Sequence, residues 1–120
     1  MIMSVNSYKD LIVWQKSFDL VKNVYKLTAQ LPVEEKYGLA DQARRCAVSI
    51  PSNIAEGHQR NNTKEYRHFL GVARGSAGEL ETQTLLMSDL YELEVTEVIA
   101  HVHEVQKMLQ ALIKKLSPSP

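Results

Sequence analysis

Basic side chains are the residues of this chain whose spacing most directly suggests a chemistry. Residues 36–75 contain seven Lys or Arg against three Asp or Glu, a net charge of +4, whereas residues 76–105 contain seven acidic residues and no Lys or Arg. A local cluster of cations attracts phosphate, so we expect a nucleic-acid interface around the turn between the second and third expected helices. The alternative is that basic and acidic surfaces pair within or between subunits. The candidate nucleic-acid-binding residues are Arg44, Arg45, Arg60, Lys64, Arg67 and Arg74.

A second set of polar residues lies on or beside the apolar stripes of two expected helices. Buried polar groups need hydrogen-bond partners, and a paired network would determine helix register and order. We expect Arg44 and Arg45 to meet acidic members of this set, while a pocket for a partner or small molecule is the alternative. The candidates for a structural polar network are Gln42, Ser49, Asn53, Glu56, Glu79 and Glu81.

Residue types that support catalysis, metal binding or cofactor binding do not form a recognisable pattern. The single cysteine, Cys46, excludes an intrachain disulfide, and its apolar heptad position favours a buried, inert thiol. Glu65 and His68 have the Glu-x-x-His spacing of di-iron bundles, but the chain has no second copy. A glycine-rich phosphate loop is also missing. We therefore predict no catalytic residue, no metal site and no cofactor.

The overall composition is that of an ordinary globular protein. Of the 120 residues, 44% are hydrophobic and 23% are charged, with equal numbers of cations and anions, which excludes a wholly disordered chain and a uniformly basic nucleic-acid binder. No run approaches the roughly 18 apolar residues of a membrane span, and the N-terminus lacks a secretory signal. We expect a cytoplasmic protein without a membrane partner, with one domain at residues 1–116 and a frayed tail at 117–120.

Apolar periodicity predicts an all-α fold with four helices. The expected ranges are 7 or 9 to 30, 32 or 34 to 57–60, 63 to 91 and, after a turn at 92–96, a last helix up to 116. The apolar register continues unchanged through Pro51, which favours a kink in the second helix over two short helices. Short connections between such helices predict an up-down-up-down antiparallel four-helix bundle.

Apolar residues of the first helix fall on two stripes. We expect the core to contain the stripe with 3-4 spacing, which is Leu11, Trp14, Phe18, Val21 and Tyr25. A second group exceeds what one seam needs, and we expect it to be buried between subunits, with a wider monomer core as the alternative. This group contains Val13, Leu20, Val24, Leu27, Ile99, Met108 and Ile113.

Three glycines interrupt the first half of the third expected helix. Each glycine inside a helix costs roughly 1 kcal/mol relative to alanine, so Gly71, Gly75 and Gly78 need compensation. We expect close backbone approach, either between the second and third helices or between subunits. Contact of this backbone with a ligand is the alternative.

Several segments together resemble a known family. They are Asp10–Lys16, Tyr37–Leu39 with Gln42, Arg44–Gly57, Phe69–Leu70, Ala73–Ser76 and Glu79–Thr82. The longest of them, RRCAVSIPSNIAEG, is similar to the four-helix bundle family of 23S rRNA-intervening-sequence proteins, and the match spans nearly the whole chain. Cys46 occupies a position where the family usually has alanine, which keeps a small residue there.

The resemblance implies a four-helix bundle that typically assembles as a homopentamer, with no established enzymatic activity. Some relatives are encoded within insertions in 23S rRNA genes, and a similar bundle is the accessory protein of diversity-generating retroelements, where it contacts a reverse transcriptase and nucleic acid. We therefore predict a non-enzymatic homo-oligomer that binds structured RNA, or a nucleic-acid-associated protein, through a ring of basic residues. A protein-binding adaptor or scaffold without nucleic-acid binding is the alternative.

Overall fold

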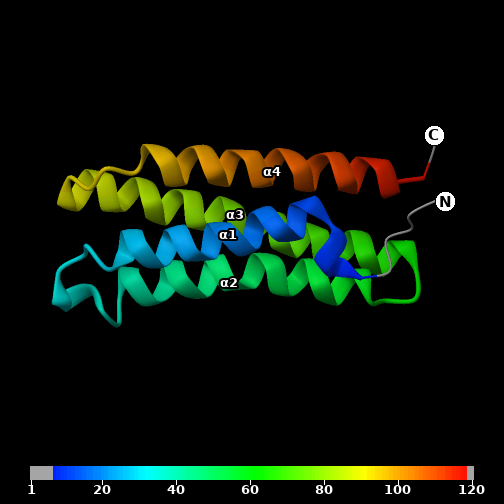
Figure 1. Cartoon of the computed structure of the whole chain (residues 1–120), viewed down its shortest axis with the longest axis horizontal. Helices are drawn as coiled ribbons and strands as arrows, with labels where there is room; N and C mark the ends of the chain where they lie inside the picture. The colour runs from blue at the N-terminus through cyan, green and yellow to red at the C-terminus, as the bar shows by residue number, and fades with distance from the viewer. Residues whose placement is uncertain (1–6, 119–120) are drawn as a thin grey trace.

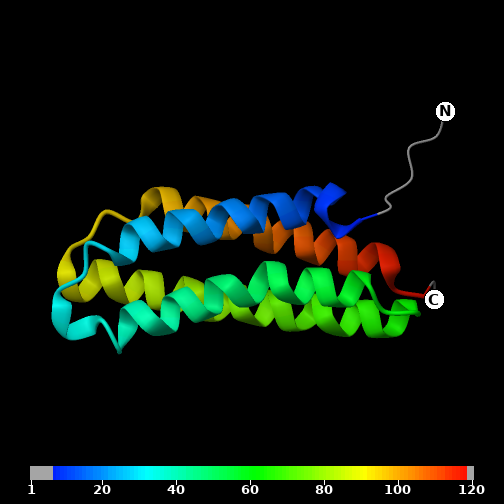
Figure 2. The same cartoon turned by 60° about the horizontal axis from the view of Figure 1, so that its bottom comes forward.

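The structure, a computed structural model, describes residues 7–118 as four long helices. The helices are α1 (Ile12–Thr28), α2 (Leu39–His58), α3 (Thr63–Tyr91) and α4 (Thr96–Leu116), and the short 3-10 helices η1 (Tyr8–Asp10) and η2 (Val33–Glu35) precede α1 and α2. Consecutive helices run in opposite directions (Figure 1), which confirms the predicted antiparallel bundle. Figure 2 shows two layers, with α1 and α4 in one layer and α2 and α3 in the other.

The buried faces of α3 and α4 follow the predicted heptads. On α3, Leu70, Ala73, Ala77, Leu80 and Met87 are inaccessible to solvent. The corresponding residues of α4 come from its valine and leucine stripe. Alternating spacings of three and four residues place such side chains on one face of a helix, which then packs against the neighbouring helices. The buried α4 residues, with Val95 just before the helix, are Val98, Val102, Val105 and Leu109.

The core face of α1 is different from the predicted one. Phe18 and Tyr25 are 45% and 44% exposed, and Leu11, Trp14 and Val21 are partly buried, so the expected stripe lies at the edge of the core. The buried stripe contains the residues expected between subunits, so that expectation is wrong for them. This stripe is hard to recognise in the sequence, because the polar residue Ser17 interrupts its apolar pattern. Its hydroxyl donates to the Trp14 carbonyl oxygen, which allows complete burial. The buried apolar residues of α1 are Val13, Leu20, Val24 and Leu27.

Two helices begin later than the periodicity predicts. The first α-helix begins at Ile12, after η1, and the second begins at Leu39, after η2 and a turn. Glu35 explains the second boundary, because its carboxylate accepts a hydrogen bond from the Leu39 backbone N–H. A Cβ at Gly38 would lie 2.6 Å from that carboxylate, so glycine leaves room for it. Hydrogen bonds from Tyr91 and Leu39 lower the pKa of Glu35.

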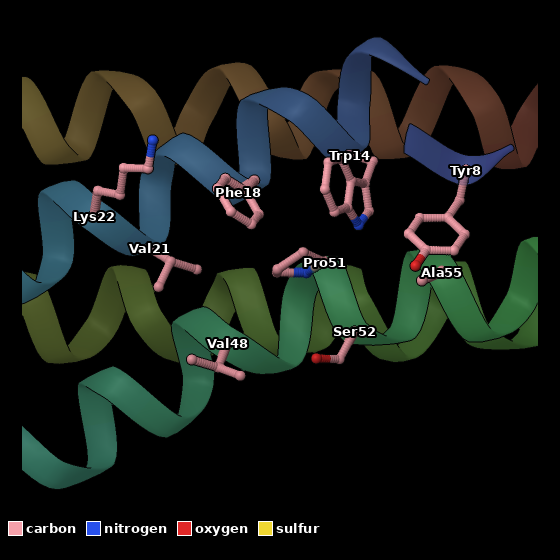
Figure 3. Close-up of a pocket in the computed structure, with 9 residues that line it drawn as sticks. All are labelled: Tyr8, Trp14, Phe18, Val21, Lys22, Val48, Pro51, Ser52 and Ala55. Carbon is pink, nitrogen blue, oxygen red and sulfur yellow. The ribbon is translucent and has the colours of Figure 1, made fainter. Parts of the chain in front are cut away.

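Pro51 lies within an uninterrupted α2, which confirms one helix rather than two. Proline has no N–H for the Ala47 carbonyl, so the helix loses one hydrogen bond at this point. Figure 3 shows the α2 ribbon changing direction beside Val48 and Pro51. The Pro51 ring is buried, and it faces α1. A proline that packs into the helix contact recovers part of the cost of the missing bond.

The turn between α2 and α3 ends in a side-chain cap on α3. The side-chain oxygen of Asn62 accepts a hydrogen bond from the Glu65 N–H at 2.8 Å. The Glu65 carboxylate binds the Asn62 side-chain amide rather than its backbone N–H, so the reciprocal contact of a capping box is made through the side chain. At the other end of the chain α4 ends at Leu116, and residues 119–120 of the expected tail lie outside the described residues.

Candidate functional site

The six basic candidates lie at different places along the bundle. Arg44 and Arg45 are in the first half of α2, whereas Arg60 and Lys64 flank the turn at its far end. A helix rises about 1.5 Å per residue, so the 16 residues from Arg44 to Arg60 place them roughly 24 Å apart. Arg67 and Arg74 continue along α3. The six residues therefore do not gather in one patch.

Three of these arginines already have partners within the chain. The Arg44 Nε donates to Thr28 Oγ1 at 2.8 Å, and its guanidinium lies 4.6 Å from the centre of the Tyr25 ring. Arg45 pairs with Asp41 four residues earlier, and Arg60 with Glu56. Exposed pairs of this kind contribute at most about 1 kcal/mol. Arg44 thus joins α2 to α1. Within the described residues, neither Arg44 nor Arg45 forms the expected ion pair with Glu56, Glu79 or Glu81.

Arg67 and Arg74 both face the groove between α3 and α4. The Arg67 guanidinium donates to the Leu116 carbonyl oxygen at 2.8 Å and so holds the last turn of α4. Cationic groups are favourable there, since the helix dipole is negative at its C-terminus. Arg74 lines a pocket of about 420 Å³. The other residues that line it are Gly78, His103, Gln106, Lys107 and Gln110.

Glu81 links α3 to α4 beside this pocket. One carboxylate oxygen is 2.9 Å from His103 Nε2, and the other accepts from the Gln106 amide at 2.9 Å. These hydrogen bonds, that from His103 first, lower the pKa of Glu81. Of the predicted network residues, Glu81 is thus paired, but with a helix that the prediction did not consider.

Ser49 and Asn53 form the polar contact between α2 and α3. The Ser49 hydroxyl lies 2.9 Å from that of Ser76, and the Asn53 amide donates to the Ser49 hydroxyl and carbonyl oxygen. Because each of these polar side chains has a hydrogen-bond partner, their partial burial costs little free energy, and the cluster orients α2 against α3. Gln42 and Glu56 are exposed, and they lie outside it.

A second contact between α2 and α3 surrounds Cys46. Burial, followed by a hydrogen bond to Glu79, raises the pKa of the Cys46 thiol to about 11. The thiol is therefore protonated at neutral pH, as the inert thiol of the prediction requires. The Gln83 amide is 3.5 Å from Glu79, and Gln83 Oε1 is the buried side-chain oxygen that lacks a partner within residues 7–118. An unpaired buried acceptor of this kind costs about 1–3 kcal/mol.

The α3 glycines do not mediate an approach of α2 to α3. A Cβ built at Gly71, Gly75 or Gly78 has no neighbouring atom within 4 Å. The alternative of close approach within the chain is therefore wrong for these three. Gly57 of α2 is the close contact, because a Cβ there would lie 2.8 Å from Phe69 Cβ.

Apolar side chains accompany these glycines on the outside of α3. Val72, Leu86 and Leu90 are 40%, 42% and 59% exposed. With Gly75 and Glu79 they follow the helical repeat, so they share one face. We call this set (Val72, Gly75, Glu79, Leu86 and Leu90) the outer stripe of α3.

The groove between α1 and α2 is apolar and aromatic. Trp14 and Phe18 stack with ring centres 5.0 Å apart, and Tyr8 contacts the Trp14 edge. Figure 3 shows these three rings of α1 and η1 above Pro51 and Ala55 of α2. The side chains border a pocket of about 380 Å³. Trp14, Phe18 and Val21, which the sequence assigned to the core, line this pocket.

Residues 7–118 contain no group of three or more His, Cys, Asp or Glu side chains that could hold a metal ion. None of the four helices has a long enough apolar stretch to cross a bilayer.

Comparison with known proteins establishes the family. The sequence model of the 23S rRNA-intervening sequence protein family matches residues 9–111. The chain belongs to this family. That match confirms the resemblance drawn from the RRCAVSIPSNIAEG segment and its neighbours. No curated protein is similar enough to the chain to add a comparison.

A solved structure supports the fold of this intervening-sequence family member. It is the crystal structure of a protein of unknown function from the S23 ribosomal protein family of Bacteroides thetaiotaomicron. The two chains are 24% identical, the TM-score is 0.79, and the similarity covers 86% of this chain and 96% of the other. At this level of identity the likeness concerns the four-helix bundle alone.

Proposed function

We propose that this intervening-sequence family member is a non-enzymatic assembly protein whose copies associate through the outer stripe of α3, as a homopentamer. The observation that carries the proposal is the exposure of Leu86 and Leu90, which lie one turn apart on the same helix face as Val72. Apolar side chains that lie together on the surface of a small protein favour contact with another protein surface. The number of five subunits comes from the family resemblance.

Gly75 supports association through the same stripe. It lies in the middle of α3, where glycine is less favourable than alanine by about 1 kcal/mol, and its missing Cβ relieves no clash within the chain. A neighbouring subunit that packs closely on the α3 backbone would account for a glycine at this position. The core of the single chain does not.

Light scattering coupled to size exclusion tests the proposal. The wild type is expected to have a mass five times that of the 13.6 kDa chain. Leu86→Glu should raise the subunit dissociation constant by about 30-fold, the equivalent of a 2 kcal/mol hot spot, because it places a charge in the contact. Its helical circular dichroism should be unchanged, since Leu86 is 42% exposed.

Ile12→Glu is the matched control, because Ile12 is also exposed but lies at the start of α1. It should leave the mass unchanged. A wild type of 13.6 kDa at high protein concentration would contradict the assembly. A mass that falls with Ile12→Glu and not with Leu86→Glu would contradict the assignment of the interface to α3.

Contact with structured RNA is the second candidate function. The specific observation in its favour is Arg74, which shares its pocket with a second cation, Lys107. In a ring of identical subunits, weak phosphate contacts would repeat and add by avidity. The protein-binding scaffold without nucleic-acid binding remains the alternative, and the RNA measurements below distinguish the two.

A further inference from the structure

The register of α3 against α4 brings cations from both helices together. Arg67 reaches Leu116, and Glu81 reaches His103 and Gln106. Between these two contacts, Arg74 and Gly78 lie opposite residues 106–110 of the antiparallel α4. The helices thereby place Lys107 with Arg74, although the two are far apart in the sequence and Lys107 lies outside the basic region that the sequence singles out.

The lining of this α3–α4 pocket consists of hydrogen-bond donors and carries no carboxylate. Arg74 and Lys107 are positively charged, and Gln106 and Gln110 carry amide N–H groups. An arginine guanidinium presents a planar fork of N–H groups that matches two phosphate oxygens, and a lysine adds a point charge. At about 420 Å³ the pocket has room for a phosphate group with part of its substituent.

The acidic groups next to the pocket are already engaged. Glu81 is bound by His103 and Gln106, and Glu104 pairs with Lys16 of α1 at 3.5 Å. By contrast, neither Arg74 nor Lys107 forms an ion pair within the described residues. The two cations are therefore available to an external anion.

Gly78 makes the pocket hollow. A Cβ at this position would meet no atom within 4 Å, so the absent side chain leaves space between Arg74 and α4 rather than relieving a clash. An anion can thus approach the α3 backbone. Gly78 lies one turn from Gly75 of the outer stripe and about 60° from it around the helix, so the pocket borders the proposed subunit contact.

We infer that the α3–α4 pocket binds a phosphate group through Arg74 and Lys107. The inference rests on the RNA-binding candidate only for the source of that phosphate, which is either an RNA backbone or a small phosphate-containing molecule. It assigns Gly78 and Lys107 to the site, and it leaves the cations at the α2–α3 turn out of it.

Titration with inorganic phosphate tests the pocket itself. At constant ionic strength, phosphate in place of chloride should shift the NMR signals of the Gly78 amide and the Arg74 Nε–H. Arg74→Gln should weaken binding by about tenfold, as expected for one charge-assisted hydrogen bond. Gly78→Leu should abolish the shifts by filling the space while keeping the helix. Lys26→Gln removes an exposed cation from the last turn of α1 and should change nothing.

Fluorescence anisotropy with a labelled RNA hairpin tests the source of the phosphate. If the RNA backbone enters the pocket, Arg74→Gln and Lys107→Gln should each reduce the slope of log K against log salt by about 0.9. Gly78→Leu should weaken RNA binding, and Lys26→Gln should again leave it unchanged.

The two measurements separate failure of the pocket from failure of the RNA function. Phosphate shifts without RNA binding would support the pocket as a site for a small phosphate compound and contradict RNA binding. RNA binding that is equal in wild type, Gly78→Leu and Arg74→Gln would support the RNA function and overturn the pocket. The absence of both responses would overturn both.

Discussion

The inner and outer faces of α3 both carry small and aliphatic residues, but only those of the inner face are buried within the chain. On the inner face, alanines and leucines pack without solvent contact, and Gly57 of α2 brings the two backbones together beside Phe69. On the outer face, Gly75 lies in open space next to exposed Val72, and Leu86 is exposed further along the same face. The single chain thus gives the inner face a complete structural explanation and leaves the outer face without one.

This difference shows that a glycine in a helix has no meaning until its neighbours are known. At Gly57 the missing side chain is a packing requirement, because Phe69 and Tyr66 occupy its place. At Gly75 the missing side chain lowers helix stability by about 1 kcal/mol relative to alanine, and no contact within the chain offsets this loss. Substituting alanine at each position tests the comparison directly.

Gly57→Ala is expected to have the largest effect. Its Cβ would lie 2.8 Å from Phe69 Cβ and 3.2 Å from the Tyr66 backbone oxygen, and backbone cannot move aside easily. Overpacking of this kind should lower the free energy of unfolding by about 2 kcal/mol, measured by urea denaturation. An unchanged or increased stability would show that α2 and α3 can separate there, and the contrast between the two faces would be lost.

Gly75→Ala should have the opposite sign in the isolated chain. The added methyl group meets no atom of the same chain, so helix propensity should raise the free energy of unfolding by about 1 kcal/mol. In the Leu86→Glu background, where subunits are expected to be separate, urea denaturation measures this gain. In the wild-type background the same change should weaken assembly, and a gain in both would count against close packing at the outer stripe.

Glu81→Gln should have the smallest effect on the free energy of unfolding. It sharpens the comparison, because Glu81 lies outside the core but has partners within the chain, His103 and Gln106. Hydrogen bonds lower its pKa in the folded state, so its contribution is complete above the ordinary glutamate pKa and is lost as the pH falls through the lowered value. We expect a loss of about 0.5 kcal/mol at pH 7 that becomes smaller as the pH falls below the ordinary glutamate pKa.

Asp89→Asn is the matched control for this measurement, because Asp89 is exposed on the same helix and has no ion pair within the described residues. Unfolding free energies at pH 7 and pH 3 should differ little from wild type. A deficit of Glu81→Gln that persisted unchanged at pH 3 would show that the carboxylate charge is not its cause.

The periodic helices of the fold were predictable from the sequence, whereas the starts of α1 and α2 were not. The heptads of α3 and α4 correctly predicted which side chains are buried, because nearly every core position there is apolar. On α1, Ser17 interrupts the true stripe, and Trp14 and Phe18 compete with it. The start of α2 depends on Glu35, which caps Leu39 from outside the helix, and apolar spacing carries no information about such a cap.

The candidate site was less predictable than the fold. Charge counting identified Arg74 but not Lys107, since the pairing depends on how α4 runs back along α3. It also included Arg44, whose guanidinium is occupied by Thr28 and Tyr25. The antiparallel order of the predicted helices was the signal that could have placed residues 103–110 beside residues 74–81.

The sequence alone determined the helix count, the family and most of the core, because these depend on local periodicity and on one long matching segment. The tertiary structure alone decided which α1 stripe is buried, which arginines are free and which glycines face open space. Those properties depend on distances between helices. A linear pattern specifies the faces of a helix, but only packing determines what each face meets.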